Sequence, residues 1–379
     1  MEDRAFILAE AFPPGEYIKD ELDARGWNQA DLAEIMGRSP KLVSAIIAGS
    51  SSITPETAQA LGEAFGTSAQ VWMNLDAVYR LWRLRPDERV ARRARLYAKG
   101  PIKEMVHRRF IEPSEDLDAL ERRVKDFFEL ESLEDQPRFA YAARKSTTYT
   151  ETTPVQYAWL FRAKALAQAV PVSRPFTDDA FKDALAGLRP LMANPEDIYK
   201  IPNVLGAAGI RLVVVEPLSG MKIDGVTFWL DDSSPVIALS MRYGRIDWFW
   251  FSVLHEMDHV GHCEGALDVQ LVGKDAVPSQ TKNPTEQRAD RFAADFEIPC
   301  QQLESFIARV APLYSKVRIA GFAATLGIHP GLVVGRLQHD GQVGFAHSRD
   351  MLADIRHLVV SAVLTDGWGE SPRVGTEGR

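Results

Sequence analysis

The stretch that decides the fold is Trp248-Phe-Trp-Phe-Ser-Val-Leu-His255-Glu256-Met-Asp-His259-Val-Gly-His262. In an α-helix, residues i and i+4 lie one above the other on the same face, so His255 and His259 can hold one metal ion between them. Glu256 lies about 100° further round the helix, where its carboxylate can reach a water molecule beside the metal. The stretch therefore predicts a metal-binding helix in which Glu256 is the catalytic base. The plain alternative is an ordinary helix with three polar residues.

The surrounding sequence favours a helix and a third ligand. Asp247 is a good N-cap, and neither Gly nor Pro occurs between Trp248 and Gly261. A catalytic zinc site has three protein ligands and one open position. The downstream candidates for the missing ligand are His262, Cys263, Glu264, Asp268, Glu286 and Asp290.

Glu286 is the best placed of these candidates. Asn283 and Pro284 predict the N-cap and first residue of a second helix, which carries small alanines suited to close packing on the first. A carboxylate from that helix would complete a His₂Glu set for Zn²⁺. Asp290 stays open as a ligand or as a partner that orients a histidine. His262 is less suitable, because one straight helix rarely supplies three ligands in tetrahedral geometry.

The sequence before the metal helix changes from helical patterns to short strands. Three β-branched runs at 209–217, 224–230 and 234–240 are separated by Gly, Pro, Asp and Ser. Residues 117–128 and the segment that follows Thr153-Pro154 show helical spacing of apolar side chains. We therefore expect a mainly α protein with a small β-sheet.

Composition and charge limit the functional classes. A chain of 379 residues is too long for one ordinary core. It has no run of 18 apolar residues and no basic-then-apolar N-terminal signal. Its two cysteines, Cys263 and Cys300, cannot build a disulfide framework, which fits a reducing compartment. These features predict a cytoplasmic protein without a membrane span.

The charge is uneven along the chain, whose net charge is −8. Residues 1–75 carry 5 Lys/Arg against 11 Asp/Glu, whereas residues 80–109 carry 11 Lys/Arg against 3 Asp/Glu. The basic block at 80–109 has two interpretations. It lies along DNA phosphates, or it forms a solvated helix face paired with acidic neighbours.

Five short helices are predicted in the first 84 residues. Their start and stop signals are Pro13-Pro14-Gly15 and Gly26, Asn28 and Gly37, Ser39-Pro40 and Gly49, Thr54-Pro55 and Gly66, and Ser68. Between the second and third helices, Gly37 supplies a left-handed turn. Arg38, Ser39, Lys41 and Ser44 face outward near the start of the third helix and are short or basic, as a helix entering the major groove of DNA requires. A plain bundle used for dimerisation is the alternative.

Several segments of this region carry a resemblance. They are Gln29-Ala-Asp-Leu-Ala33, Ser44-Ala-Ile-Ile-Ala-Gly49, Ile53-Thr-Pro-Glu-Thr-Ala58, Ala64-Phe-Gly66 and Trp72-Met-Asn-Leu75. They resemble the DNA-binding domain of HigA-type antitoxins within the Xre/Cro class, over residues 8–84. The resemblance implies a lambda-repressor-like domain, a homodimer and a palindromic operator in double-stranded DNA. It also adds Gln29 to the residues expected at the DNA.

The metal motif carries a second resemblance. His255-Glu256-x-x-His259, Glu286-x-x-Ala289-Asp290-x-Phe292-Ala293 and Ile298-Pro299 resemble the ImmA/IrrE-type metallopeptidase domain over residues 205–300. That family is similar to gluzincins and is linked to the inactivation of repressor proteins. The departure is Asp258, where the family usually has a small residue. The extra acid either tunes the metal or marks a site that has lost activity.

These patterns give five expected segments. They are a helix-turn-helix domain at 1–84, a helical connector at 85–203, an α+β zincin-like metallopeptidase domain at 204–300, a helical extension at 301–365 and a disordered tail at 366–379. In the extension, two helices meet at Gly327-Ile-His329-Pro330, where we expect a packing role. Two residues have alternatives to a structural role. His329 could approach the metal, and Cys263 could be a ligand or a redox-sensitive thiol.

Two hypotheses of function follow. In the first, the protein binds operator DNA and its zinc endopeptidase domain cleaves a toxin or repressor protein, with Glu256 accepting and returning a proton. In the second, it is a non-enzymatic repressor or antitoxin whose metallopeptidase fold binds a toxin or effector without cleavage, as Asp258 leaves open. A third, weaker option is a sensor in which metal occupancy switches DNA binding.

Overall fold

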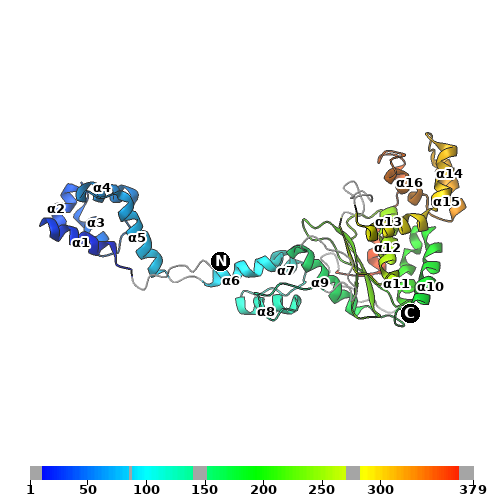
Figure 1. Cartoon of the computed structure of the whole chain (residues 1–379), viewed down its shortest axis with the longest axis horizontal. Coiled ribbons are helices and arrows are strands. Elements are labelled where there is room, and N and C mark those ends of the chain that lie inside the picture. Colours follow the sequence, from blue (N-terminus) through cyan, green and yellow to red (C-terminus); the bar gives the residue numbers. More distant parts are fainter. Residues whose placement is uncertain (1–10, 85–87, 140–151, 270–281, 367–379) are drawn as a thin grey trace. The chain divides into compact units, whose positions relative to one another are not determined.

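The computed structural model of the chain describes residues 11–84, 88–139, 152–269 and 282–366. The chain forms two compact units, Met1–Ala91 and Arg92–Arg379. The first unit contains α1 (Pro14–Arg25), α2 (Gln29–Ile35), α3 (Pro40–Ile47), α4 (Pro55–Phe65) and α5 (Ala69–Arg83) (Figure 1). The helix α6 (Glu88–Lys99) crosses the division between the units.

The five helices of the first unit begin and end as the sequence predicts. Asn28, Ser39 and Thr54 each accept a hydrogen bond from a backbone amide in the first turn of the helix that they cap. Gly37 has φ +60°, so the turn between α2 and α3 uses the left-handed backbone that glycine permits. The core beneath them is formed by side chains from all five helices, including Ile18, Leu32, Val43, Ile46, Leu61 and Trp72.

The second unit adds further helices and one mixed sheet. The remaining α-helices are α7 (Ile102–His107), α8 (Leu117–Phe127), α9 (Pro154–Ala169), α10 (Asp178–Leu188), α11 (Ile201–Ala207), α12 (Ile246–Gly261), α13 (Pro284–Glu297), α14 (Cys300–Val310), α15 (Lys316–Leu326), α16 (Pro330–His339) and α17 (Arg356–Ala362). Short 3₁₀ turns are η1 (Arg189–Met192), η2 (Pro195–Lys200) and η4 (Arg349–Met351). The strands are β1 (Arg211–Val214), β2 (Ile223–Trp229), β3 (Pro235–Leu239), β4 (Ala266–Val269) and β5 (Leu364–Thr365).

The sheet has the strand order β4-β2-β3-β1-β5. Strand β1 pairs in parallel with β3 and β5, and β2 pairs antiparallel with β3 and β4. Strands β1 and β3 fall within their predicted β-branched runs, and β2 begins one residue before its run, whereas the sequence patterns did not predict β4 or β5. Both are short, and β5 has only two residues, too few for a pattern to show.

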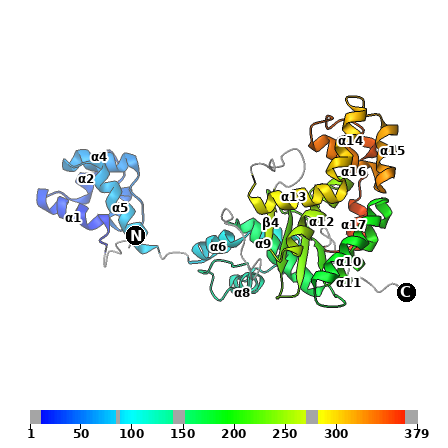
Figure 2. The ribbon, with the colours of Figure 1, turned by 45° about the vertical axis from the view of Figure 1, so that its right-hand side comes forward.

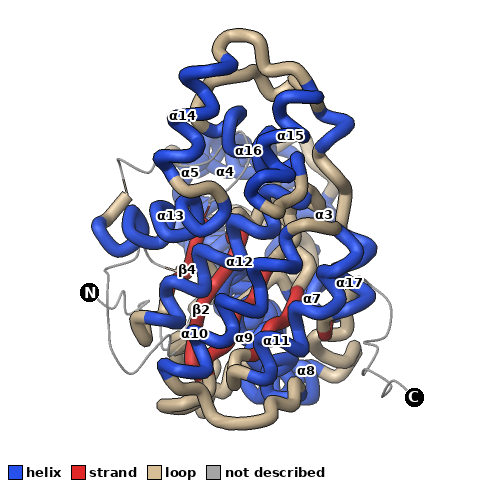
Figure 3. The backbone as a smooth tube through the Cα atoms, turned by 90° about the vertical axis from the view of Figure 1, so that its right-hand side faces the viewer, coloured by secondary structure: helices blue, strands red, loops and turns tan. Residues whose placement is uncertain are grey.

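Helices cover both faces of the sheet. Along β1, Leu212 and Val214 belong to the core beneath α10, α11 and α12, and Val213 belongs to the core beneath α8 and α9. This alternation is the two-residue period of a strand buried on both sides. Figure 2 shows α8 and α9 on one side of the sheet and α10 to α12 on the other. In Figure 3, α12 crosses the face of the sheet with α13 beside it.

The unit boundaries differ from the expected segments. Residues 92–139 and 152–203 were expected to form a connector, yet they share a core with the strands, and the Trp159 indole donates a hydrogen bond to the Val215 carbonyl at 3.0 Å. The expected C-terminal extension supplies β5 to the same sheet. Asp366, expected to begin a disordered tail, is buried; the rest of that tail lies outside the described residues. These segments belong to the same compact unit as the strands, because a sheet that is buried on both faces needs helices on both sides.

The structure corrects the expected N-cap of α12 and gives His329 a structural role at α16, in place of the alternative near the metal. Arg245 is the N-cap of α12, and Asp247 lies inside the first turn, where it forms a two-point ion pair with Arg245. His329 caps α16 by accepting a hydrogen bond from the Gly331 amide at 3.1 Å. Its side chain therefore has a structural role at the α15–α16 turn.

None of the described helices alone combines the length and apolar character needed to cross a membrane. The helices α15 and α16, which meet at 110°, meet the criterion of length and composition only as a bent pair.

Candidate functional sites

The predicted metal ligands come together in the second unit. His255 and His259 lie one turn apart on α12, and α13 brings Glu286 to them because Asn283 caps α13 through the Glu286 amide. The ligand atoms of these three residues lie within 4.8 Å of one another. The His255 Nε2 atom is 3.2 Å from both His259 Nε2 and Glu286 Oε2. This is the only group of three or more metal-binding side chains among the described residues.

The outer nitrogens of the two imidazoles face carboxylates. His255 Nδ1 lies 3.0 Å from Asp290 Oδ1, and His259 Nδ1 lies 3.3 Å from Glu264 Oε2. A carboxylate at Nδ1 holds a proton there and leaves the Nε2 lone pair free to bind a metal. Asp290 and Glu264, both open candidates for the third ligand, therefore stand behind the histidines as orienting groups.

Both orienting carboxylates keep their negative charge. Burial opposes the ionisation of Glu264, but hydrogen bonds with His259 and Arg288 prevail and lower its pKa to about 2. Burial likewise opposes the ionisation of Asp290, and its hydrogen bond with His255 and the charge of Lys282 keep its pKa below the usual value. The Lys282 ammonium lies 2.9 Å from Asp290 Oδ2. Anionic partners make each imidazole a better metal ligand.

Glu256 points toward the sheet. The Thr227 hydroxyl on β2 donates a hydrogen bond to Glu256 Oε2 at 2.7 Å. A Cβ added at Gly225, two residues earlier on β2, would lie 2.1 Å from Glu256 Oε1. The absence of a side chain at Gly225 thus makes room for this carboxylate. The sequence patterns did not single out Thr227, although a Gly and a Thr at alternate positions of a strand that is apolar apart from Asp224 are a usable signal.

Asp258 forms an ion pair between two packed helices. Its Oδ2 atom lies 2.8 Å from Nε of Arg288, so the residue joins α12 to α13. Neither Asp258 nor His262 belongs to the group that could hold a metal. The His262 ring, whose side chain is 48% exposed, faces the Asp258 carbonyl. Cys263 is a half-buried free thiol, and the side chain of Asp268 is not among those described.

The donor set fits Zn²⁺. Two imidazoles and one carboxylate are the His₂Glu ligands of catalytic zinc sites, and both imidazoles have the outer-shell carboxylates that such ligands use. His255, Glu256 and His259 are each 0% exposed, and Glu286 is 8% exposed. The three candidate ligands therefore lie in a low-dielectric interior. A bound cation there would neutralise the Glu286 carboxylate and accept the lone pairs of the two imidazoles.

The predicted DNA-binding residues lie in the first unit. Gln29 begins α2, and Arg38, Ser39, Lys41 and Ser44 lie in the turn and the first part of α3. All five side chains are exposed. The Ser39 hydroxyl is engaged as the α3 cap, where it accepts from the Leu42 amide at 3.3 Å. Two cations and two short polar side chains thus surround the start of the second helix of a helix-turn-helix.

Part of the basic block is used inside the second unit. Arg92 on α6 binds Glu121 on α8 at 2.7 Å and also pairs with Asp118. Arg108 is buried and pairs with Asp366. These contacts agree with the interpretation of a helix face paired with acidic neighbours, at least for Arg92.

The comparisons with known proteins concern the first unit. A family model described as helix-turn-helix matches residues 18–72. The HTH-type transcriptional regulator YddM of Escherichia coli K12 is 32% identical over 68 residues, which cover 18% of this chain and 72% of YddM. The chain belongs to the helix-turn-helix transcriptional regulators. Its α2–α3 pair is the DNA-binding element of this family.

Two solved structures are also similar to part of this regulator. An addiction module antidote protein of the HigA family from Coxiella burnetii is 32% identical, and the match covers 20% of the regulator and 82% of that protein, with a TM-score of 0.19. PA4674 from Pseudomonas aeruginosa, solved in complex with its operator DNA, is 36% identical, and the match covers 20% of the regulator and 81% of PA4674, with a TM-score of 0.19.

Proposed function

We propose that the protein is a homodimeric regulator that binds operator DNA through its first unit and carries a zinc-dependent endopeptidase in its second. The observation that carries the enzymatic half is the group formed by His255, His259 and Glu286, backed by Asp290 and Glu264. Its substrate is a regulatory protein, such as a toxin or a repressor. This unites the zincin-like interpretation of the second unit with the helix-turn-helix in the first.

The roles of the residues follow from their positions. His255, His259 and Glu286 would hold zinc, which when bound would polarise a peptide carbonyl and acidify water. Glu256, in a fully buried position on the same helix, would accept a proton from water and return it to the leaving amine. Thr227 orients the Glu256 carboxylate by donating to Oε2. Asp258 is neutralised by Arg288, so its presence is compatible with an active site.

Glu256→Gln is expected to slow cleavage strongly. The zinc-loaded full chain and the variant are each incubated with the product of the neighbouring gene, and fragments are identified by mass spectrometry. Because loss of a general base costs about 10²–10⁴-fold in rate, cleavage by the variant is expected to fall at least about a hundredfold. Glu304→Gln, the same change at an exposed position on α14, is the matched control and keeps full activity.

A second variant separates the position of Glu256 from its chemistry. In Gly225→Ala the added methyl group displaces the Glu256 carboxylate, so cleavage falls while zinc content is retained. Equal cleavage by wild type and Glu256→Gln would contradict the role of Glu256. Zinc binding without cleavage would instead favour a non-enzymatic regulator.

The enclosure of the site favours one other candidate function. All three ligands are almost completely buried, which suits a structural or sensing metal as well as a catalytic one. In a sensor, zinc would change the affinity of the protein for DNA. Operator affinity that is the same with zinc and with a chelator would eliminate this candidate.

Arg38→Ala and Lys41→Ala are each expected to weaken operator binding about tenfold. Both side chains are exposed at the start of α3, where a cation meets phosphate or a base edge. In a dimer each change removes two contacts, so a lost phosphate contact lowers the slope of log K against log salt by about 2. Binding to DNA upstream of the protein's own operon is measured at several salt concentrations. Lys19→Ala, an exposed lysine on α1, is the control; an equal loss in Lys19→Ala would contradict the assignment of α3.

A further inference from the structure

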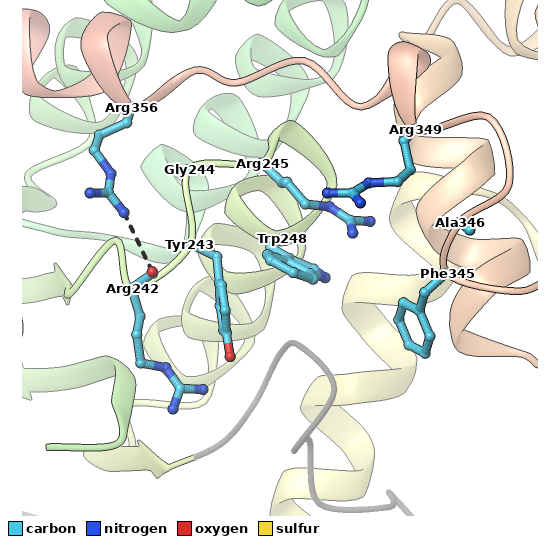
Figure 4. Close-up of a pocket in the computed structure, with 9 residues that line it drawn as sticks. All are labelled: Arg242, Tyr243, Gly244, Arg245, Trp248, Phe345, Ala346, Arg349 and Arg356. Carbon is cyan, nitrogen blue, oxygen red and sulfur yellow. Dashed lines mark hydrogen bonds between the residues drawn. The ribbon is translucent and has the colours of Figure 1, made fainter. Parts of the chain in front are cut away.

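A second site in this unit lies beside the start of α12. A cavity of about 620 Å³ is bordered by four arginines, Arg242, Arg245, Arg349 and Arg356, and no acidic side chain lines it among the described residues. Figure 4 shows Tyr243, Arg245 and Trp248 on one side of it and Phe345 and Arg349 on the other. Its volume falls in the range of small-molecule sites.

Two of the arginines are fixed by buried carboxylates behind them. Arg242 forms a two-point pair with Asp224, with N–O distances of 2.8 and 3.2 Å. Arg245 forms another with Asp247, at 3.0 and 2.6 Å. These pairs hold the guanidinium groups at the cavity and compensate their charges.

Arg349 supplies the positive charge that the cavity offers a ligand. Arg356 is already engaged, because it donates to the Met241 carbonyl at 3.0 Å. Arg349 is exposed and forms no hydrogen bond or ion pair through its side chain with any part of the chain that the structure describes. A guanidinium at the rim of an arginine-lined cavity is suited to bind a carboxylate or phosphate in two-point fashion.

Aromatic rings supply an apolar wall between these charges. The Tyr243 and Trp248 rings have centroids 4.2 Å apart, and Arg245 lies 3.9 Å from the centre of the Trp248 ring. Phe345 is 43% exposed across the cavity. A ligand that satisfies both kinds of lining has an anionic group and an apolar portion.

We propose that this cavity binds an organic anion, which carries a carboxylate or phosphate group beside an apolar portion and is held through Arg349. Two sources have this chemistry. One is a free small molecule, which requires nothing of the proposed peptidase. The other is an acidic side chain of a polypeptide substrate, which rests on the proposed function.

The position of Trp248 makes the second source physically reasonable. Trp248 precedes His255 by seven residues, or two turns of α12, so the two side chains share a helix face about 10 Å apart along the axis. An extended peptide covers that distance in about three residues. A substrate at the metal ligands would then place an acidic residue about three positions from the cleaved bond in the cavity.

Calorimetric titration of the full chain tests the proposal with two probes. The first is phenyl phosphate, added to wild type, Arg349→Ala and Arg318→Ala, an exposed arginine on α15 that serves as control. The second is a pair of peptides that differ only by Glu or Gln three residues from the scissile position, added to the Glu256→Gln background so that none is cut. A charge-assisted pair of this kind is worth about 10- to 100-fold in affinity.

We expect Arg349→Ala to weaken phenyl phosphate binding at least tenfold and Arg318→Ala to leave it unchanged. A preference for the Glu peptide that disappears in Arg349→Ala identifies the polypeptide source, and phenyl phosphate binding without that preference identifies a free anion. Neither probe binding, or equal binding by Arg349→Ala and wild type, overturns the proposal. Phenyl phosphate binding is read without zinc or cleavage, so failure of the peptidase leaves this result intact.

Discussion

Replacing His259 with alanine is expected to reduce bound zinc from about one ion per chain to none. The His259 Nε2 atom lies 3.2 Å from His255 Nε2 and 3.7 Å from Glu286 Oε1, so the imidazole is one of three converging donors. Loss of a carboxylate behind a ligating histidine already weakens metal binding about 10–100-fold, and loss of the ligand itself costs more. Elemental analysis after dialysis against a zinc buffer measures the stoichiometry.

His262→Ala is the matched control for this variant. The two histidines are three residues apart, but the His262 ring faces the Asp258 carbonyl and does not join the ligand group. It should keep one zinc per chain. Removal of the buried His259 ring also perturbs packing. Glu286→Gln therefore serves as a second variant, which removes a ligand with little change in side-chain shape. Circular dichroism checks that both variants fold. Zinc retained in both variants would show that the metal binds at another site. Zinc absent from wild type would show that the protein binds none.

The candidate metal site was largely predictable because each of its parts is local. The i,i+4 spacing places two histidines on one helix face, and Asn283-Pro284 signals the start of the helix that carries Glu286. The sequence did not decide which of the nearby acidic residues bind the metal and which orient the histidines. Asp290 and Glu264 become orienting groups, and Asp258 becomes a partner of Arg288, through the packing of α12 on α13. That packing angle and register depend on tertiary contacts, which no spacing encodes.

Non-local contacts account for what could not be predicted. The capped helices of the first unit follow from signals within a few residues. By contrast, β5 pairs with β1 across about 150 residues of chain, and Arg108 meets Asp366 across 258. An arginine in a basic block and an aspartate before a Gly-rich end look like surface residues individually. Only the pairing of β5 with β1 brings them into the same interior.

Arg108→Met is expected to destabilise the second unit by about 3–5 kcal/mol. The Arg108 side chain is 6% exposed and pairs with Asp366, whose side chain is 0% exposed. It also donates to the Glu216 carbonyl at 2.9 Å, while Asp366 accepts from the Glu216 amide at 3.2 Å. Methionine keeps much of the packing on Phe110 but leaves the Asp366 carboxylate buried without its cation. Arg162, which also attracts Asp366, places the expected loss toward the lower end of the range.

Denaturant unfolding of the full chain, followed by tryptophan fluorescence, measures this loss, because Trp159 is buried in the same core. Lys103→Met, an exposed lysine on α7, is the control and should change stability by less than about 0.5 kcal/mol. The double variant Arg108→Met/Asp366→Leu should be more stable than Arg108→Met, since replacing both partners removes the uncompensated charge. A double variant less stable than the single one would show that packing, rather than the stranded carboxylate, sets the cost. The buried pair would then act as a spacer beside the ends of β1 and β5, and its charges would contribute little to keeping the two strands paired.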